Sequence, residues 1–103
     1  MAKGYWIASG EVTDTEAYKK YIEANAAPLK EFGARFLVRG GEYESVAGTC
    51  GSRNVVLEFD SYEKALACYK SDAYQKAVEY RNLASDMNVT IIAGYDGPQP
   101  GDG

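Results

Sequence analysis

The order of strand-like and helix-like segments constrains the fold of this chain more than any other feature. Four segments are predicted to be strands, because apolar residues alternate with polar ones or because Val, Ile, Leu and Phe are concentrated there. They are residues 5–12, 34–39, 53–59 and 89–93. Helical patterns separate the first strand from the second and the third from the fourth. The predicted order is therefore β-α-β-β-α-β.

Both helical regions have identifiable beginnings and ends. Asp14 is a favourable N-cap residue, and apolar residues recur at three- and four-residue spacing until Gly33 ends the first helix. Pro28 lies inside this helix, and we expect it to kink or divide the helix because it removes a hydrogen bond. Ser61 caps the second helical region, which restarts at Ser71 after a break.

The predicted order indicates an α+β, ferredoxin-like subunit, with an antiparallel four-stranded sheet and both helices on one face. Residues 1–97 are expected to form this single domain, and residues 98–103, rich in Gly and Pro, a flexible C-terminal tail. The other face of the sheet carries Ile, Val and Leu and has no cover within the subunit. We therefore predict a homodimer with two-fold symmetry, in which a second copy covers this face.

Charge and hydropathy exclude several classes of partner. The net charge is −4 and the Lys and Arg residues are scattered, so nucleic-acid binding is not expected. No apolar run approaches the roughly 20 residues that span a bilayer, and the first residues lack the apolar segment of a signal peptide. We expect a cytoplasmic protein in which Cys50 and Cys68 are reduced thiols.

The chain has no histidine, which removes a large part of enzyme chemistry. Nucleophiles that depend on a histidine base, and zinc or haem sites with histidine ligands, are excluded. The carboxylates show no spacing typical of a calcium loop. We therefore predict no metal and no cofactor. Any proton transfer must use Asp, Glu, Tyr, Lys, Cys or the substrate itself.

Several stretches resemble a bacterial protein family. The most specific are the FLVRGG run at residues 36–41 and the CYKSxxYQ run at residues 68–75, with Arg81 beyond it. With residues 4–7 and 55–59 they are similar to the domain of unknown function 1330 family. The resemblance implies a ferredoxin-like subunit in a dimeric α/β barrel, and no established reaction. Related barrels include cofactor-free monooxygenases, muconolactone-type isomerases and haem proteins, and the missing histidine argues against the haem branch.

Three residues are candidates for catalysis. Arg39 ends a strand beside the glycines at 40–41, where it can pair with a carboxylate or enolate. The alternative for Arg39 is a salt bridge to Glu58 or Glu42. Tyr18 lies on a helix stripe that faces the sheet, either as a phenol donor to substrate or as a core aromatic residue. Glu58 lies on a central strand, either as a general base with a raised pKa or as the structural partner of an arginine.

Four further residues are candidates for substrate binding. Tyr69 and Tyr74 lie on helix stripes and are phenol donors or core aromatic residues. Trp6 packs in a core or a dimer interface, or it forms the floor of an aromatic pocket. Arg81, like Arg39, can lower the pKa of a nearby tyrosine so that the phenol acts as a base.

These candidates suggest three kinds of function. The first is an enzyme without metal or organic cofactor, which acts on a small anionic or phenolic molecule by proton transfer or oxygenation. The second is a homodimer that binds a small molecule without changing it. The third is a structural homodimer with no pocket.

Overall fold

The computed structural model describes residues 2–101, and their elements follow the predicted order. The helices are α1 (Thr15–Glu31), α2 (Tyr62–Lys70) and α3 (Asp72–Ala84). The strands are β1 (Gly4–Val12), β2 (Arg35–Arg39), β3 (Arg53–Phe59) and β4 (Ser85–Ala93).

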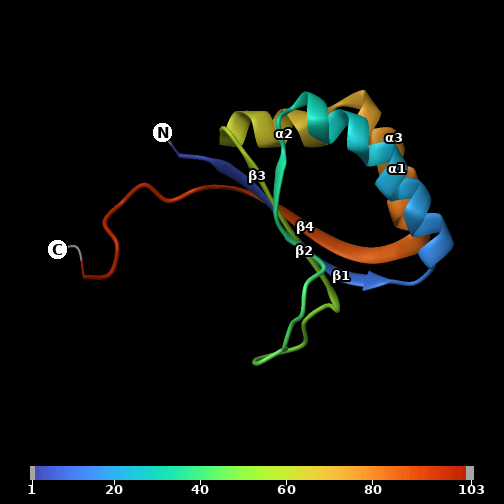
Figure 1. Cartoon of the computed structure of the whole chain (residues 1–103), viewed down its shortest axis with the longest axis horizontal. Coiled ribbons are helices and arrows are strands. Elements are labelled where there is room, and N and C mark those ends of the chain that lie inside the picture. The colour runs from blue at the N-terminus through green and yellow to red at the C-terminus, as the bar shows by residue number, and fades with distance from the viewer. Residues whose placement is uncertain (1, 102–103) are drawn as a thin grey trace.

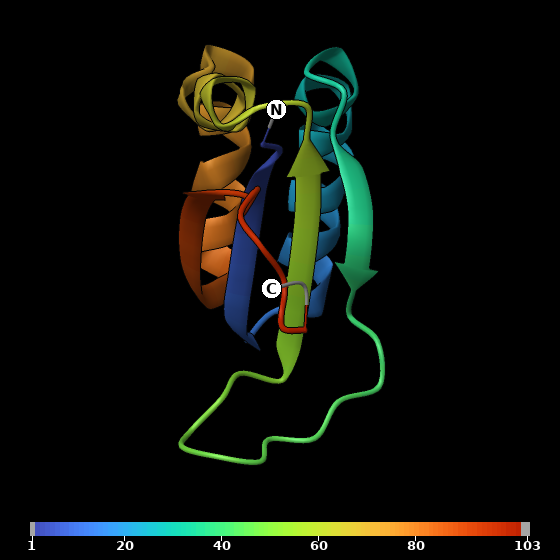
Figure 2. The ribbon, with the colours of Figure 1, turned by 90° about the vertical axis from the view of Figure 1, so that its left-hand side faces the viewer.

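The four strands form one sheet in the order β2-β3-β1-β4, and all neighbouring strands are antiparallel. The helices cover one face of this sheet and leave the other open, as Figures 1 and 2 show. This arrangement confirms the predicted ferredoxin-like subunit. The pairing of β2 with β3 shifts by one residue between Phe36 and Val38, a β-bulge that lets Arg39 pair with Val55.

Helix α1 begins and ends where the sequence predicts, but Pro28 does not divide it. The carboxylate of Asp14 accepts a hydrogen bond from the backbone N–H of Ala17. Pro28 lies inside one helix that runs from residue 15 to residue 31, so of the two expected effects the division is wrong and the kink stays a prediction. The proline ring is fully buried, and the packing of α1 along α3 stabilises the helix despite the lost hydrogen bond.

A glycine with positive φ ends helix α1. Gly33 has φ of 72°, and its N–H donates to the carbonyl of Lys30 while the N–H of Ala34 donates to the carbonyl of Leu29. These two hydrogen bonds form a Schellman motif, which satisfies two of the last helical carbonyls. The motif turns the chain directly into β2.

Ser71 separates α2 from α3 and supports both. Its hydroxyl donates to the carbonyl of Cys68 at 2.7 Å, and the same oxygen accepts from the backbone N–H of Tyr74 at 3.3 Å. One side chain therefore caps the end of α2 and the beginning of α3. The predicted break at this position is confirmed.

The core lies between the sheet and the helices and is rich in aromatic rings. Trp6 is 3% exposed, and its indole N–H donates to the carbonyl of Ala65 at 2.8 Å. Its ring centroid lies 5.1 Å from that of Phe59 and 4.7 Å from that of Tyr74, with tilted and edge-on orientations. Such geometries are favourable for aromatic pairs, so this cluster joins β1 to β3 and α3.

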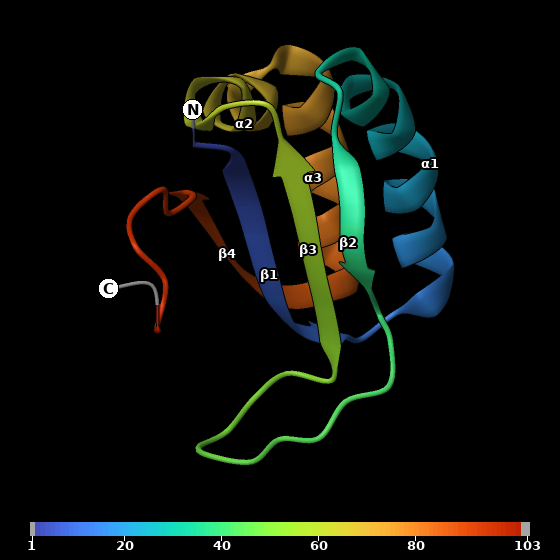
Figure 3. The ribbon, with the colours of Figure 1, turned by 60° about the vertical axis from the view of Figure 1, so that its left-hand side comes forward.

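The open face of the sheet carries apolar side chains that no helix covers. Ile7, Val38 and Ile92 are 45%, 41% and 47% exposed, and Figure 3 looks onto this face. Residues 40–52 form a long loop and residues 94–101 a segment without helix or strand, and both project beyond the sheet (Figure 1). The radius of gyration is therefore 14.7 Å, against about 13 Å for a compact domain of this length.

Only part of the predicted C-terminal tail is described by the structure. Residues 98–101 contain a turn, and the hydroxyl of Tyr95 donates to the carbonyl of Pro98 at 2.7 Å. Residues 102–103 lie outside the described part of the chain, and the flexibility of the tail stays a prediction. None of the helices within residues 2–101 has the length and apolar character needed to cross a membrane.

Candidate functional site

A cavity lies between the sheet and helices α1 and α3. Its volume is about 30 Å³, which is room for about two water molecules. Apolar side chains from four strands and α1 form most of its wall, among them Trp6, Leu29, Val55, Leu57 and Val89. The cavity sits where the core packing between sheet and helices is incomplete.

Among residues 2–101, three arginines line this cavity and no carboxylate does. They are Arg39 from β2, Arg53 from β3 and Arg81 from α3. Within residues 2–101, none of the three forms a salt bridge. The whole chain has a net charge of −4, so the positive charge here is a local concentration that its own acidic residues do not neutralise.

Arg81 is the most buried of the three arginines. Arg81 is 9% exposed. Nη1 donates to the hydroxyl of Tyr74 at 3.3 Å, and Nη2 donates to the hydroxyl of Tyr69 at 3.1 Å. Neutral phenols accept these hydrogen bonds but supply no negative charge. A buried cation without a counter-ion is costly, which points to an anion as the missing partner.

Arg53 is a functional candidate that the sequence reasoning missed. It pairs with Gly10 in the sheet, and strand alternation places it on the helix-covered face with Val55 and Leu57. Its guanidinium carbon lies 5.5 Å from the centre of the Tyr18 ring. Its Nε is buried and has no hydrogen-bond partner among the described residues. The alternation of Arg53 with the apolar residues of its strand was the available signal.

Arg39 lies at the exposed rim of the cavity. Its guanidinium carbon is 4.1 Å from the centre of the Phe36 ring, a cation–π contact that holds the side chain over the cavity. The salt bridge that was the alternative for Arg39, to Glu58 or Glu42, is absent from the described structure. Arg39 is therefore a cation with room for an external partner.

The tyrosines at the cavity are hydrogen-bond donors rather than bases. Burial raises the pKa of Tyr74 far above its ordinary value, and the nearby Tyr21 adds to this effect. Burial and Tyr21 also raise the pKa of Tyr18, and the opposing effect of Arg53 is smaller. A phenol base would need its pKa lowered instead. At neutral pH these hydroxyls carry their protons and can donate them in hydrogen bonds.

Asn25 is a polar residue in the cavity wall without a protein partner. It is 6% exposed, and its side-chain amide makes no hydrogen bond with the described residues. Among the described residues only Nε of Arg53 is both fully buried and without a partner, so the unpaired amide of Asn25 is accessible from the cavity that it lines. The amide of Asn25 therefore has both donor and acceptor capacity for a bound water or ligand. Tyr21 lies one helical turn before it and also lines the cavity.

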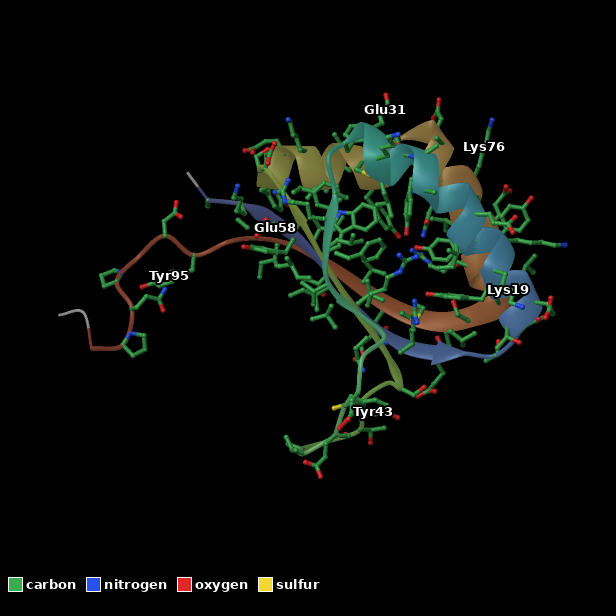
Figure 4. The ribbon with its side chains drawn as sticks, in the orientation of Figure 1. Lys19, Glu31, Tyr43, Glu58, Lys76 and Tyr95 are labelled. Atoms are coloured by element: carbon green, nitrogen blue, oxygen red, sulfur yellow. The ribbon has the colours of Figure 1, made fainter. Side chains whose placement is uncertain are left out.

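Glu58 lies on the opposite face of the sheet and does not line the cavity. Its carboxylate accepts hydrogen bonds from Nε of Arg35 at 3.0 Å and from the hydroxyl of Tyr5 at 3.2 Å. Figure 4 shows Glu58 on the side away from the helices. The structural pairing with an arginine, predicted as the alternative, is the one found, and Arg35 is the partner. A second carboxylate, Asp60, also pairs with Arg35, which lowers the pKa of Asp60.

Of the predicted site residues, the structure brings five together at one cavity, namely Arg39, Tyr18, Trp6, Tyr74 and Arg81. Tyr69 stands just behind them, since it binds Arg81 without lining the cavity itself. Arg53, Asn25 and Tyr21 are the additions that the structure makes. Among residues 2–101 there is no group of three or more Cys, Asp or Glu residues that could hold a metal ion.

The two cysteines are free and lie far from each other in the sequence. Cys50 is exposed in the loop between β2 and β3, and Cys68 is buried in α2. Burial raises the pKa of the Cys68 thiol to about 12. Cys68 is therefore a neutral core residue rather than a nucleophile.

Comparison with protein families assigns the chain to one family. Residues 3–95 match the family described as Domain of unknown function (DUF1330), and the chain belongs to this family. The predicted resemblance is thereby confirmed. No curated protein matches the chain in sequence.

Solved structures share the fold at low sequence identity. A protein of unknown function from Rhodopseudomonas palustris aligns with a TM-score of 0.73 and 13% identity, over 93% of this chain and 85% of that one. A dimeric protein of unknown function with a ferredoxin-like fold comes from Bacteroides fragilis NCTC 9343. It aligns with a TM-score of 0.58 and 11% identity, over 90% of this chain and 96% of that one. A candidate antibiotic biosynthesis monooxygenase from Caulobacter crescentus CB15 aligns with a TM-score of 0.61 and 14% identity, over 92% of each chain. These similarities show the fold.

Proposed function

We propose that this protein binds a small organic anion or phenol in the cavity between its sheet and helices, and acts on the molecule in its anionic form. One observation carries the proposal: of the residues that the structure describes, three arginines and no carboxylate line the cavity. Buried cations are normally paired. Here the protein supplies hydrogen-bond acceptors to Arg81 but no counter-ion to any of the three, so the ligand supplies the negative charge.

The size of the cavity limits what part of the ligand it can hold. A volume of about 30 Å³ accepts an anionic head group in place of water, but not a whole aromatic ring. The remainder of the ligand extends to the rim, where Phe36 and Arg39 are exposed and stacked on each other. The stacked side chains of Phe36 and Arg39 offer a flat surface for the aromatic or enolic part of the ligand.

The chemistry that these residues support is stabilisation of a negative charge. Guanidinium groups close to a bound phenol or enol lower its pKa, because they favour the ionised form. The proton leaves to water, since no carboxylate of the described residues lines the cavity to accept it. An enolate or phenolate is electron-rich and is the form that reacts with molecular oxygen. One oxygen atom forms a new carbonyl group in the substrate, and the other leaves as water with two hydrogens of the substrate, so the step needs no external reductant. The fold shared with a candidate monooxygenase supports oxygenation as the reaction, and binding without turnover is the alternative.

A homodimer is part of the proposal. Ile7, Val38 and Ile92 are exposed on a sheet face that no helix covers, and large apolar patches of this kind usually mark interfaces. The dimeric protein from Bacteroides fragilis shares the fold. Light scattering of wild type should give a dimer, and Ile7→Lys should give a monomer. Leu83→Lys is the matched control, because Leu83 is 78% exposed on α3, away from the sheet face. A monomeric wild type contradicts the homodimer.

The ionisation of 4-nitrophenol tests the ligand site. Its absorbance reports the fraction of phenolate, so a titration with and without protein gives the pKa of the bound form. We expect wild type to lower this pKa and Arg53→Met to lower it less. Lys76→Met removes the same charge from the outer surface of α3 (Figure 4) and should behave as wild type. An equal pKa of free and bound 4-nitrophenol, or no binding, contradicts the proposal.

A further inference from the structure

A chain of hydrogen bonds runs from a buried arginine to the cavity. Nη1 of Arg81 donates to the hydroxyl of Tyr74 at 3.3 Å. The hydroxyl oxygens of Tyr74 and Tyr21 are 2.6 Å apart, in a hydrogen bond that joins α3 to α1. Tyr74 and Tyr21 are 1% and 8% exposed, and both line the cavity. The direction of the central hydrogen bond decides what this chain can offer to a ligand.

Counting protons gives that direction. Each tyrosine hydroxyl has one proton to donate. If Tyr21 donated to Tyr74, then Tyr74 would accept two hydrogen bonds and its own proton would have no partner among the described residues. If Tyr74 donates to Tyr21, the one proton left over belongs to Tyr21, the less buried residue. The second arrangement avoids an unsatisfied donor at the more deeply buried position.

Arg81 strengthens the Tyr21 hydroxyl as a donor through Tyr74. A hydrogen bond from a guanidinium polarises the hydroxyl of Tyr74 and makes its proton a better donor. Tyr74 in turn polarises Tyr21 in the same way. The free proton of Tyr21 is therefore that of an activated phenol, held at the cavity wall.

Asn25 adds a second unused donor beside Tyr21. The two residues are four positions apart on α1 and lie on the same face of the helix. Asn25 is 6% exposed, and its amide has no hydrogen-bond partner among residues 2–101. From the sheet side, the buried Nε of Arg53 also lacks a partner. Unused donors thus border the cavity from both the helix layer and the sheet layer.

We propose that Tyr21 is the main hydrogen-bond donor to an oxyanion head group, a carboxylate or phenolate oxygen, that replaces water in the cavity. Tyr74 and Arg81 are positioning residues that orient and polarise the Tyr21 hydroxyl, and Asn25 donates beside it. This inference rests on the proposed function, and it names the contact that selects an anionic oxygen. A head group without an acceptor oxygen leaves the Tyr21 proton unpaired and is rejected.

The affinity for 4-nitrophenolate in four proteins tests this inference. Removal of a hydrogen bond to a charged group weakens binding about 10- to 100-fold, and we expect a loss of this size for Tyr21→Phe. Tyr74→Phe removes the hydrogen bond from Tyr74 to Tyr21, one step before the ligand, and should cause a smaller loss of affinity. Tyr80→Phe is the matched control, because Tyr80 is 42% exposed on α3 and should bind as wild type does.

A proton NMR spectrum without ligand provides a second readout. The short hydrogen bond between Tyr21 and Tyr74 should give a low-field hydroxyl resonance in wild type that both Phe variants lose. If Tyr21→Phe does not fold, Tyr74→Phe still tests the chain by the same two measurements. Wild-type affinity in Tyr21→Phe overturns this inference and leaves the proposed function intact. No binding of 4-nitrophenolate by wild type overturns both.

Discussion

Replacement of Arg53 by methionine should stabilise the protein and weaken its ligand binding at the same time. The Nε of Arg53 is buried and has no partner in the described structure, and an unsatisfied buried donor costs about 1–3 kcal/mol. Its cation–π contact with Tyr18, at 5.5 Å, returns about 0.5–1 kcal/mol. Methionine fills a similar volume without the charge. We therefore expect Arg53→Met to raise the free energy of unfolding by about 1 kcal/mol.

Urea denaturation followed by tryptophan fluorescence measures this change. For a domain of this size, 1 kcal/mol moves the midpoint by about 0.5 M urea. All proteins are compared at one concentration, because a dimer couples stability to concentration. Lys76→Met serves as the control for the lost charge. A fall in stability of about 1 kcal/mol or more, or unchanged affinity for 4-nitrophenolate, would refute the reasoning, since Arg53 would then have a partner within the protein.

Three further predictions concern Gly40, the pH dependence of stability, and Ser71. Gly40→Ala should lower both stability and anion affinity, because φ is 64° and the new Cβ would overlap Nη1 of Arg53. Gly33→Ala is the matched control, because Gly33 has φ of 72° and open space around it. It should lower the free energy of unfolding by about 1 kcal/mol without changing affinity. Stability should fall as the pH rises above about 10, because the unfolded chain then ionises at Tyr74 whereas the folded chain, with its raised pKa, does not. Tyr74→Phe should reduce this slope in denaturation curves recorded at increasing pH. Ser71→Ala should cost about 1 kcal/mol in urea denaturation, because it removes the N-cap of α3; an unchanged midpoint would contradict this role.

The fold was predictable because its determinants are local. Strand periodicity, the caps at Asp14, Ser61 and Ser71, and the stop at Gly33 all lie within a few residues of what they control. The sequence left open whether Pro28 kinks α1 or divides it, because tertiary packing of the buried ring decides between the two. The predicted fourth strand, residues 89–93, is too short, since residues 85–88, three of them polar, also pair with β1.

The candidate site was predictable only in part, because the sequence does not say which face of a strand the helices cover. Alternation along β3 places Glu58 opposite the apolar residues Val55 and Leu57, and the structure puts the helices over those two. Glu58 therefore faces away from the cavity. The same alternation would have found Arg53. The hydrogen bond between Tyr21 and Tyr74 joins residues 53 positions apart and leaves no signal in a single sequence.

The Nε–H resonance of Arg53 tests the central claim most directly. In the free protein this proton has no hydrogen-bond partner among the described residues, and a bound oxyanion should accept it. Titration with benzoate should move the resonance downfield until it saturates, and titration with benzyl alcohol, which carries no charge, should not. An unchanged resonance at saturating benzoate, or equal shifts with both compounds, would contradict the account of the cavity as an anion site.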